Sequence, residues 1–183
     1  MPPVGTPEIL GGMTGVQVNV DNFARAETHR MFAALQEDSG GVNLLTHSRT
    51  PAPIDRQTVI RMNRDTLYSH AIVDISAGAT LTVPDAGGRY LSVMVVNEDH
   101  YINRVFHEAG TYDLTVEELG SPYVAVAART LVDPRDPGDL AAVAAVQEAS
   151  PSTRPRHSRS NRRRTTPRPS TAPVAPCLPS RRT

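Results

Sequence analysis

The sequence contains no lysine, and its single cysteine, Cys177, lies close to the C-terminus. The first 148 residues can therefore hold neither a disulfide nor a thiolate metal site, and a thiol nucleophile is excluded there. No basic stretch followed by an apolar stretch opens the chain, and no segment approaches the ~20 apolar residues that span a bilayer. We expect a soluble, cytoplasmic protein that does not enter a membrane.

Common catalytic signatures are also missing. The sequence has no G-x-S-x-G nucleophile elbow, no glycine-rich phosphate loop, no H-E-x-x-H metal motif and no dinucleotide fingerprint. The usual hydrolase, kinase and oxidoreductase sites are therefore not visible, and we predict no cofactor and no metal. Any catalysis would depend on Asp, Glu, His, Arg and Tyr side chains.

Charge divides the chain into two unlike segments. Residues 1–148 contain 10 arginines and 19 acidic residues, a formal charge of −9, whereas residues 149–183 contain nine arginines and no acidic residue, a charge of +9. The net charge of zero is the cancellation of these two segments. We predict a flexible N-terminus over residues 1–15, a folded domain over 16–148, and a disordered Arg/Pro-rich tail over 149–183.

The tail has seven prolines and no aromatic residue, so it cannot bury enough apolar surface to offset an ordering cost of about 1–2 kcal/mol per residue. It could be a nucleic-acid tether, an inert extension or the product of a frameshift. We favour the frameshift, because a GC-rich gene shifted by one base can encode a Glu-Pro-Pro-Asp-like loop at residues 159–166 and an Ala/Leu-rich helix at 170–182. Nucleic-acid binding is the weakest interpretation, since arginine runs have low specificity.

Apolar residues at three- and four-residue steps predict an amphipathic helix over Asp21–Gln36, capped by Asn19 or Asp21 and ended by Gly40-Gly41. Glu27 falls at the one gap in the apolar stripe, so it either pairs with an arginine at the edge of the stripe or has a functional role. The residues of the stripe are Val20, Phe23, Ala24, Met31, Ala34 and Leu35.

From residue 59 the apolar period changes to two, with turn residues about every ten positions. This pattern predicts a mainly β domain, an antiparallel β-sandwich or jelly-roll-like fold, rather than a βαβ layout. Asp136 as N-cap and Pro137 at the first position predict a short C-terminal helix ending near Ala149. The predicted strands are Val59–Met62, Leu67–Ile75, Ala79–Val83, Arg89–Asn97, Tyr112–Val116 and Tyr123–Leu131.

Two polar clusters could carry chemistry. In the first, guanidinium groups, an amide and a carboxylate could orient an anionic or carbonyl substrate, or could hold a strand end together. The second follows the most hydrophobic predicted strand, where His100 could act as a general base oriented by Asp99 or Glu98, or could be structural. The candidate residues are Arg61, Asn63, Arg64, Asp65 and Tyr68 in the first cluster, and Asn97, Asp99, His100 and Tyr101 in the second.

A metal site would need His100, His107 and a carboxylate to converge, and their spacing matches no common ligand pattern. A single catalytic site requires the two clusters to lie within about 10 Å of each other around one cleft, since catalytic groups must meet on one substrate. Separation of the clusters would therefore exclude a joint active site.

These same segments resemble a bacterial family of proteins designated domain of unknown function 1254, over roughly residues 16–148. The resemblance implies paired β-sandwiches or jelly rolls, a second β-rich domain of unknown function 1214 further along the chain, and no established activity. The matching segments are VDNF at 20–23, MF at 31–32, VIRMNRDTLYS at 59–69, PDAGGRY at 84–90, VNEDHY at 96–101, PYV at 122–124 and RTLVDP at 129–134.

Two hypotheses for the function follow. In the first, the domain binds a small molecule or hydrolyses it with the two polar clusters, and is truncated before its second domain. In the second, the domain is a non-catalytic interaction or structural module, whose partner covers an apolar patch such as one at Leu140–Val146. The sequence leaves the oligomeric state open.

Overall fold

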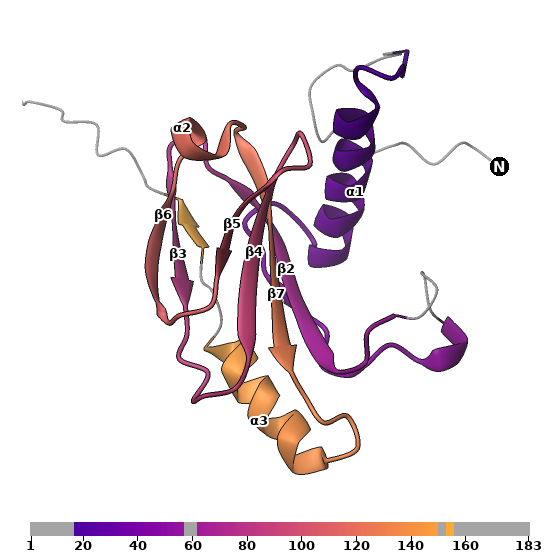
Figure 1. Ribbon diagram of the computed structural model, residues 1–183, viewed down its shortest axis with the longest axis vertical. Coiled ribbons are helices and arrows are strands. Elements are labelled where there is room, and N and C mark those ends of the chain that lie inside the picture. The colour runs from indigo at the N-terminus through magenta and orange to yellow at the C-terminus, as the bar shows by residue number, and fades with distance from the viewer. Residues whose placement is uncertain (1–16, 57–61, 150–152, 156–183) are drawn as a thin grey trace, which may run out of the picture.

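A computed structural model of the chain describes residues 17–56, 62–149 and 153–155 (Figure 1). Short strands and three helices make up these residues, with a 3-10 turn, η1, at Ile54–Arg56. None of the described helices is both long and apolar enough to cross a membrane. The helices are α1 (Phe23–Ser39), α2 (Val116–Leu119) and α3 (Pro137–Glu148), and the strands are β1 (Thr46–His47), β2 (Thr66–Asp74), β3 (Ala79–Val83), β4 (Leu91–Asn97), β5 (Ile102–Phe106), β6 (Gly110–Leu114), β7 (Tyr123–Leu131) and β8 (Thr153–Pro155).

The described strands form two antiparallel sheets. The larger sheet has the order β1-β2-β7-β4-β5, and the smaller sheet has the order β6-β3-β8. β7 occupies the centre of the larger sheet, with β2 on one side over its whole length and β4 on the other. The sequence-based prediction of a mainly β, antiparallel sandwich is confirmed.

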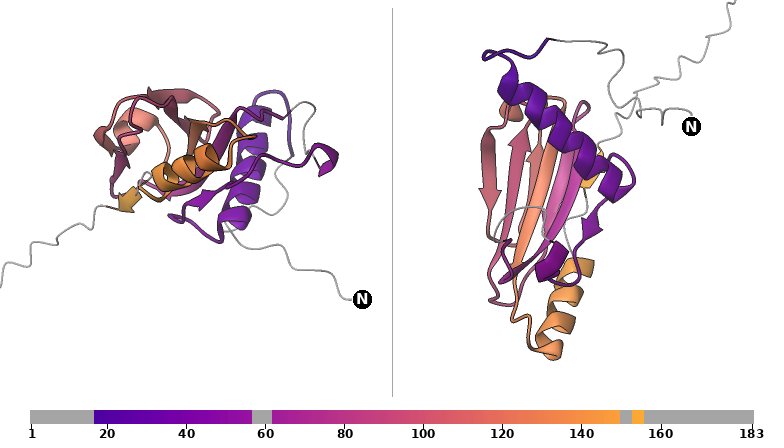
Figure 2. Two further views of the ribbon diagram at one scale, coloured as in Figure 1. Left: turned by 90° about the horizontal axis from the view of Figure 1, so that it is seen from below. Right: turned by 90° about the vertical axis from the view of Figure 1, so that its right-hand side faces the viewer.

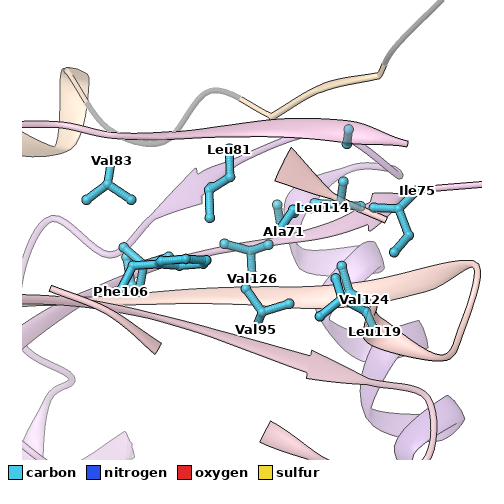
Figure 3. Packing of buried hydrophobic residues seen from close by; sticks show 14 of the residues in the cluster. Ala71, Ile75, Leu81, Val83, Val95, Phe106, Leu114, Leu119, Val124 and Val126 are labelled. Atoms are coloured by element: carbon cyan, nitrogen blue, oxygen red, sulfur yellow. The ribbon is translucent and has the colours of Figure 1, made fainter. Parts of the chain in front are cut away.

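The main core lies between the two sheets. Alternate residues of each strand point into this layer, because successive side chains of a strand face opposite sides. Buried aliphatic side chains from both sheets meet there with Phe106 (Figure 3). Phe106 also stacks on Tyr112, with ring centroids 4.1 Å apart. The buried residues of this core include Ala71, Val73, Ile75, Leu81, Val83, Val93, Val95, Leu114, Leu119, Val124 and Val126.

The two longer helices cover different faces of the larger sheet. α3 contacts Leu67 through Val143, and Leu67 points to the same side of β2 as Ala71, so α3 continues the inner layer where the smaller sheet ends. α1 lies across the opposite, outer face, where Phe32 packs on Ile72 (Figure 2). The cleft between α1 and this outer face contains the site described below.

Most predicted elements are present, with shifted ends. Ala79–Val83 and Tyr123–Leu131 are confirmed residue by residue, and the predicted strand over Tyr112–Val116 occurs at Gly110–Leu114 instead. α3 begins as predicted, since the Asp136 carboxylate accepts a hydrogen bond from the Gly138 N–H. The sequence did not indicate β1, β5, β8 or α2. Residues 59–61 of the predicted strand Val59–Met62 lie outside the described residues, and Met62 itself is in no strand.

α1 exists where it was predicted, but its buried face was predicted wrongly. Val20, Phe23 and Met31, three members of the apolar stripe, are 93, 60 and 38% exposed. The residues that α1 buries are Thr28 and Phe32. The side of α1 that is turned to the sheet therefore carries polar as well as apolar residues. Asn22 is the N-cap residue, in place of Asn19 or Asp21, and its side chain makes no capping hydrogen bond.

Two further predictions concerned the partner of Glu27 and the disorder of the tail. Glu27 pairs with Arg30 one turn along α1, as the edge-of-stripe interpretation predicted, and this hydrogen bond lowers the pKa of Glu27. Within the predicted disordered tail, Thr153–Pro155 form β8 on β3. Backbone groups alone can make such a pairing with a sheet edge, whatever the side chains are. The other tail residues from 150 onward, and residues 1–15, lie outside the described residues.

Candidate functional site

The two predicted clusters lie at opposite ends of the larger sheet. Thr66, at the start of β2, is opposite Leu131 of β7, whereas Asn97, at the end of β4, is opposite Val124. Seven residues of β7 separate these positions, or roughly 23 Å at about 3.3 Å per residue. A joint active site built from both clusters is therefore wrong.

The first cluster supports a loop. Asn63 accepts a hydrogen bond from the Asp65 N–H at 2.7 Å, and Arg64 donates one to the carbonyl oxygen of Ala52 at 2.5 Å. The Tyr68 ring lies 5.4 Å below the guanidinium of Arg129. These contacts match the structural interpretation of the cluster. Arg61 lies outside the described residues.

The second cluster is a tight turn between β4 and β5 that Asn97 organises. The buried Asn97 side chain accepts hydrogen bonds from the N–H groups of Asp99 and Tyr101, both at 3.0 Å, and donates one to the carbonyl oxygen of Leu119 at 2.9 Å. His100 adopts a left-handed conformation, with a φ of 68°. The Tyr101 side chain is exposed. Asn97 is therefore a structural residue that fixes where its neighbours point.

This turn presents three polar side chains to α1. Asp99 pairs with Arg25 at 2.6 Å, and His100 Nδ1 lies 2.9 Å from Thr28 Oγ1. The described contacts do not include the predicted orientation of His100 by Asp99 or Glu98. The side-chain contact of the His100 ring is the one between Nδ1 and Thr28. His100 and Asp99 therefore join the turn to α1.

Glu98 is also buried in this turn, and its sequence position had suggested only that it could orient His100. Its side chain is 4% exposed, with Oε1 3.1 Å from His29 Nε2 and Oε2 3.6 Å from a guanidinium nitrogen of Arg25. Glu98 Oε2 is buried and makes no hydrogen bond, and the buried His29 Nε2 lies 3.1 Å from Oε1 without the geometry of a hydrogen bond. Buried polar atoms without partners are uncommon and mark a strained, wet or ligand-binding position.

His29 was missed altogether. It lies on the face of α1 that also carries Arg25, Thr28 and Phe32, at steps of three and four residues. A search for a second, mixed stripe beside the apolar one would have found this face. The partner that makes His29 notable is 69 positions away, so no local pattern could have paired it with Glu98.

A small cavity of about 30 Å³ adjoins this pair, between α1 and the outer face of the larger sheet. This volume is enough for about two water molecules. Apart from the polar pair and Gln36, its walls are apolar or aromatic. The lining residues are His29, Phe32, Ala33, Gln36, Val42, Ile72, Glu98 and Tyr123.

A wider, open hollow of about 670 Å³ lies at the other end of the sheet, where Asp65 is among its lining residues and most of the other polar groups are paired with one another. Asp139 forms an ion pair with Arg89 and accepts a hydrogen bond from the Asp133 N–H. The Arg89 hydrogen bond, followed by the backbone one, lowers the pKa of Asp139 to about 2. Asp136 caps α3. In the described part of the chain, no three His, Cys, Asp or Glu side chains gather closely enough to hold a metal ion.

A serine and a histidine also meet, on β2 and β1. His47 Nδ1 lies 2.7 Å from Ser69 Oγ, which resembles the contact between a nucleophile and its base. Ser69 is only 1% exposed, however, and Gln147 of α3 approaches the same oxygen. Burial, then repulsion by Arg49, lowers the pKa of His47. The pair holds β1 and α3 against β2.

The fold and this cleft define an antiparallel β-sandwich domain with a helix laid over a small, partly polar cavity. The chain belongs to the family described as protein of unknown function (DUF1254), whose family model matches residues 42–153. The match extends beyond Glu148, where sequence analysis placed the end of the domain, and includes the first residue of β8.

A solved structure shares this fold. The VPA0106 protein from Vibrio parahaemolyticus is similar with a TM-score of 0.55 at 16% identity, over 73% of this chain and 36% of that protein. The chain therefore spans about a third of the length of this relative. A search of curated proteins gave no match.

Proposed function

We propose that the domain binds a small molecule in the cleft between α1 and the larger sheet, and that it does so in the cytoplasm. The observation that carries this proposal is the pair of buried atoms, Glu98 Oε2 and His29 Nε2, that lack hydrogen-bond partners beside a cavity. A ligand with a polar head and a small apolar body would satisfy these atoms and cover the apolar walls, the usual combination in small-molecule sites.

Binding is better supported than hydrolysis. None of the eight described residues that line the cavity is a serine, threonine or cysteine. The serine that does contact a histidine, Ser69, is too buried for a substrate carbonyl to reach its oxygen. The first polar cluster lies roughly 23 Å away by the strand register, so it cannot assist.

Titration with small organic molecules tests the proposal. We expect at least one of the two-carbon amines, alcohols and acids to give saturable shifts of the backbone amide resonances of Phe32, Val42 and Ile72 in NMR spectra of the full chain. Ala33→Leu should abolish these shifts, because Ala33 lines the cavity. Ala34→Leu is the matched control, since Ala34 is the next residue on α1 and is exposed. Shifts that never saturate, or that survive Ala33→Leu, would reject the proposal.

The interaction-domain hypothesis has support of a different kind. The exposed apolar stripe of α1, including Val20, Phe23 and Met31, is the surface that a partner would cover. The Leu140–Val146 segment does not form the predicted patch, because Val143 is buried in the inner layer. We propose that the partner that covers this stripe is a further domain of a longer chain, because the present chain covers only 36% of the length of the Vibrio protein.

That second function is tested by a stability comparison. Phe23→Ser and Met31→Ser should leave the stability of the isolated chain within about 0.5 kcal/mol, as is usual for exposed positions. In a longer protein carrying the next domain, the same changes should lower the unfolding temperature. Equal effects in both contexts would argue against a domain interface at α1.

A further inference from the structure

We propose that the cavity selects ligands that carry a protonated amine, an inference that rests on the proposed small-molecule site. Glu98 and His29 line the polar end of the cavity, and Arg25 contacts both Glu98 and Asp99. Beside the histidine, these side chains supply two carboxylates and one guanidinium, so the carboxylates outnumber the guanidinium groups.

The single cation is engaged away from Glu98. Arg25 lies 2.6 Å from Asp99 and 3.6 Å from Glu98, and its side chain is nearly half exposed. The carboxylate that is buried is thus the one with the weaker ion pair. Burying a carboxylate without a close cation or full hydrogen bonding is costly, so a ligand that supplies both is favoured.

The other walls suit the body of an amine. Phe32 and Tyr123 line the same cavity as Glu98, and aromatic faces attract cations electrostatically. Val42 and Ile72 provide apolar contact for an alkyl group. A carboxylate ligand would meet the uncompensated charge of Glu98, and a neutral alcohol could donate a hydrogen bond without neutralising it.

The test compares three ligands of nearly equal size, ethylammonium, ethanol and acetate, which match a cavity of about 30 Å³ that is partly open. At pH 8, NMR titration of the full chain should give a dissociation constant for ethylammonium at least about tenfold below that for ethanol, because charge-assisted hydrogen bonds are roughly twice as strong as neutral ones. Acetate should not saturate. High salt should weaken ethylammonium binding and leave ethanol unaffected.

Two variants should move the preference in opposite directions. Glu98→Gln should reduce the ratio of the ethanol to the ethylammonium dissociation constant to about 1–2, by removing the charge. Arg25→Gln, at a partly exposed position, should raise the same ratio severalfold, because it removes the competing cation. Arg30→Gln is the matched control, since Arg30 lies on the same helix and pairs with Glu27.

The outcomes separate the two proposals. Saturable binding in which ethanol or acetate equals or exceeds ethylammonium overturns the amine selectivity and leaves the small-molecule site standing. Saturable binding by none of the three overturns both. If Glu98→Gln does not fold, the three-ligand comparison and Arg25→Gln decide alone, and an unchanged ratio in Arg25→Gln counts against the inference.

Discussion

Gln147 offers a sharp test of how α3 is attached to the sandwich. It is a polar side chain at 1% exposure on the inner side of α3. Its amide nitrogen lies 3.1 Å from the carbonyl oxygen of Ser48 and 3.3 Å from that of Tyr68, with Ser69 Oγ at 3.5 Å. Two N–H groups can serve these acceptors, so one residue joins α3 to β2 and to the segment after β1.

The expected free energies follow from these contacts. Gln147→Met keeps the length of the side chain and loses the two hydrogen bonds that its amide nitrogen donates, together with a long one of 3.4 Å that Oε1 accepts from Arg49. It should therefore lower the free energy of unfolding by about 2 kcal/mol, at about 1 kcal/mol for each of the donated bonds. Gln147→Ala also removes about two buried methylene-sized groups, at ~0.8 kcal/mol each, and leaves a cavity, so its total cost should be about 4 kcal/mol.

Urea unfolding followed by circular dichroism measures both values, provided that the m-value stays at that of the wild type. Glu148→Met is the matched control, because Glu148 is the exposed neighbour of Gln147 and its contact with Arg49 is 3.9 Å long. Surface contacts of this kind contribute little, so the control should stay within about 0.5 kcal/mol of the wild type. A Gln147→Met protein as stable as that control would refute the attachment.

Three other perturbations have defined outcomes. Asp139→Asn should reduce the unfolding temperature at pH 5–7, but the difference from the wild type should close between pH 4 and 2, because Arg89 lowers the folded pKa of Asp139 from 3.8 to about 2 and its stabilisation is lost as the pH falls through that range. His47→Gln should flatten the loss of stability below about pH 6.5, since burial lowers the folded pKa of His47 and the unfolded chain takes up the proton first. Asn97→Ala should cost about 2–3 kcal/mol in urea unfolding, by removing three hydrogen bonds of the turn, and should abolish binding at Glu98. Asn97→Asp, which keeps the two acceptor contacts, should cost less in the same measurement.

Sequence periodicity located strands where burial alternates and failed where it does not. β3 alternates between buried and half-buried residues along its length, and its ends were predicted to the residue. β5 is mostly exposed, with only Phe106 buried, because it lies at the edge of the larger sheet. An edge strand with one buried side chain carries no period-two signal, so its pairing with β4 could not be inferred from the sequence.

The site shows the same division between local and distant information. The polar group at the end of β4 was recognised correctly as unusual, because Asn97 to His100 follow a hydrophobic strand. Their contacts were not foreseen, since His100 lies against Thr28, as its structural interpretation allows, and the partners of Glu98 lie about 70 residues earlier, on α1. No rule of spacing within a segment connects these positions.

The orientation of α1 ties the fold to the proposed function. A helix that packed for stability alone would turn a wholly apolar stripe to the sheet, but α1 turns Thr28 and His29 inward beside Phe32 and leaves Phe23 exposed. The turn that Asn97 fixes supplies the acidic partners for this inward face. Stability alone does not call for a buried carboxylate at Glu98, because a well-packed apolar pair is often as stable as a buried ion pair. The arrangement therefore makes physical sense as a polar end to a binding cleft, with the outward stripe left for a neighbouring domain.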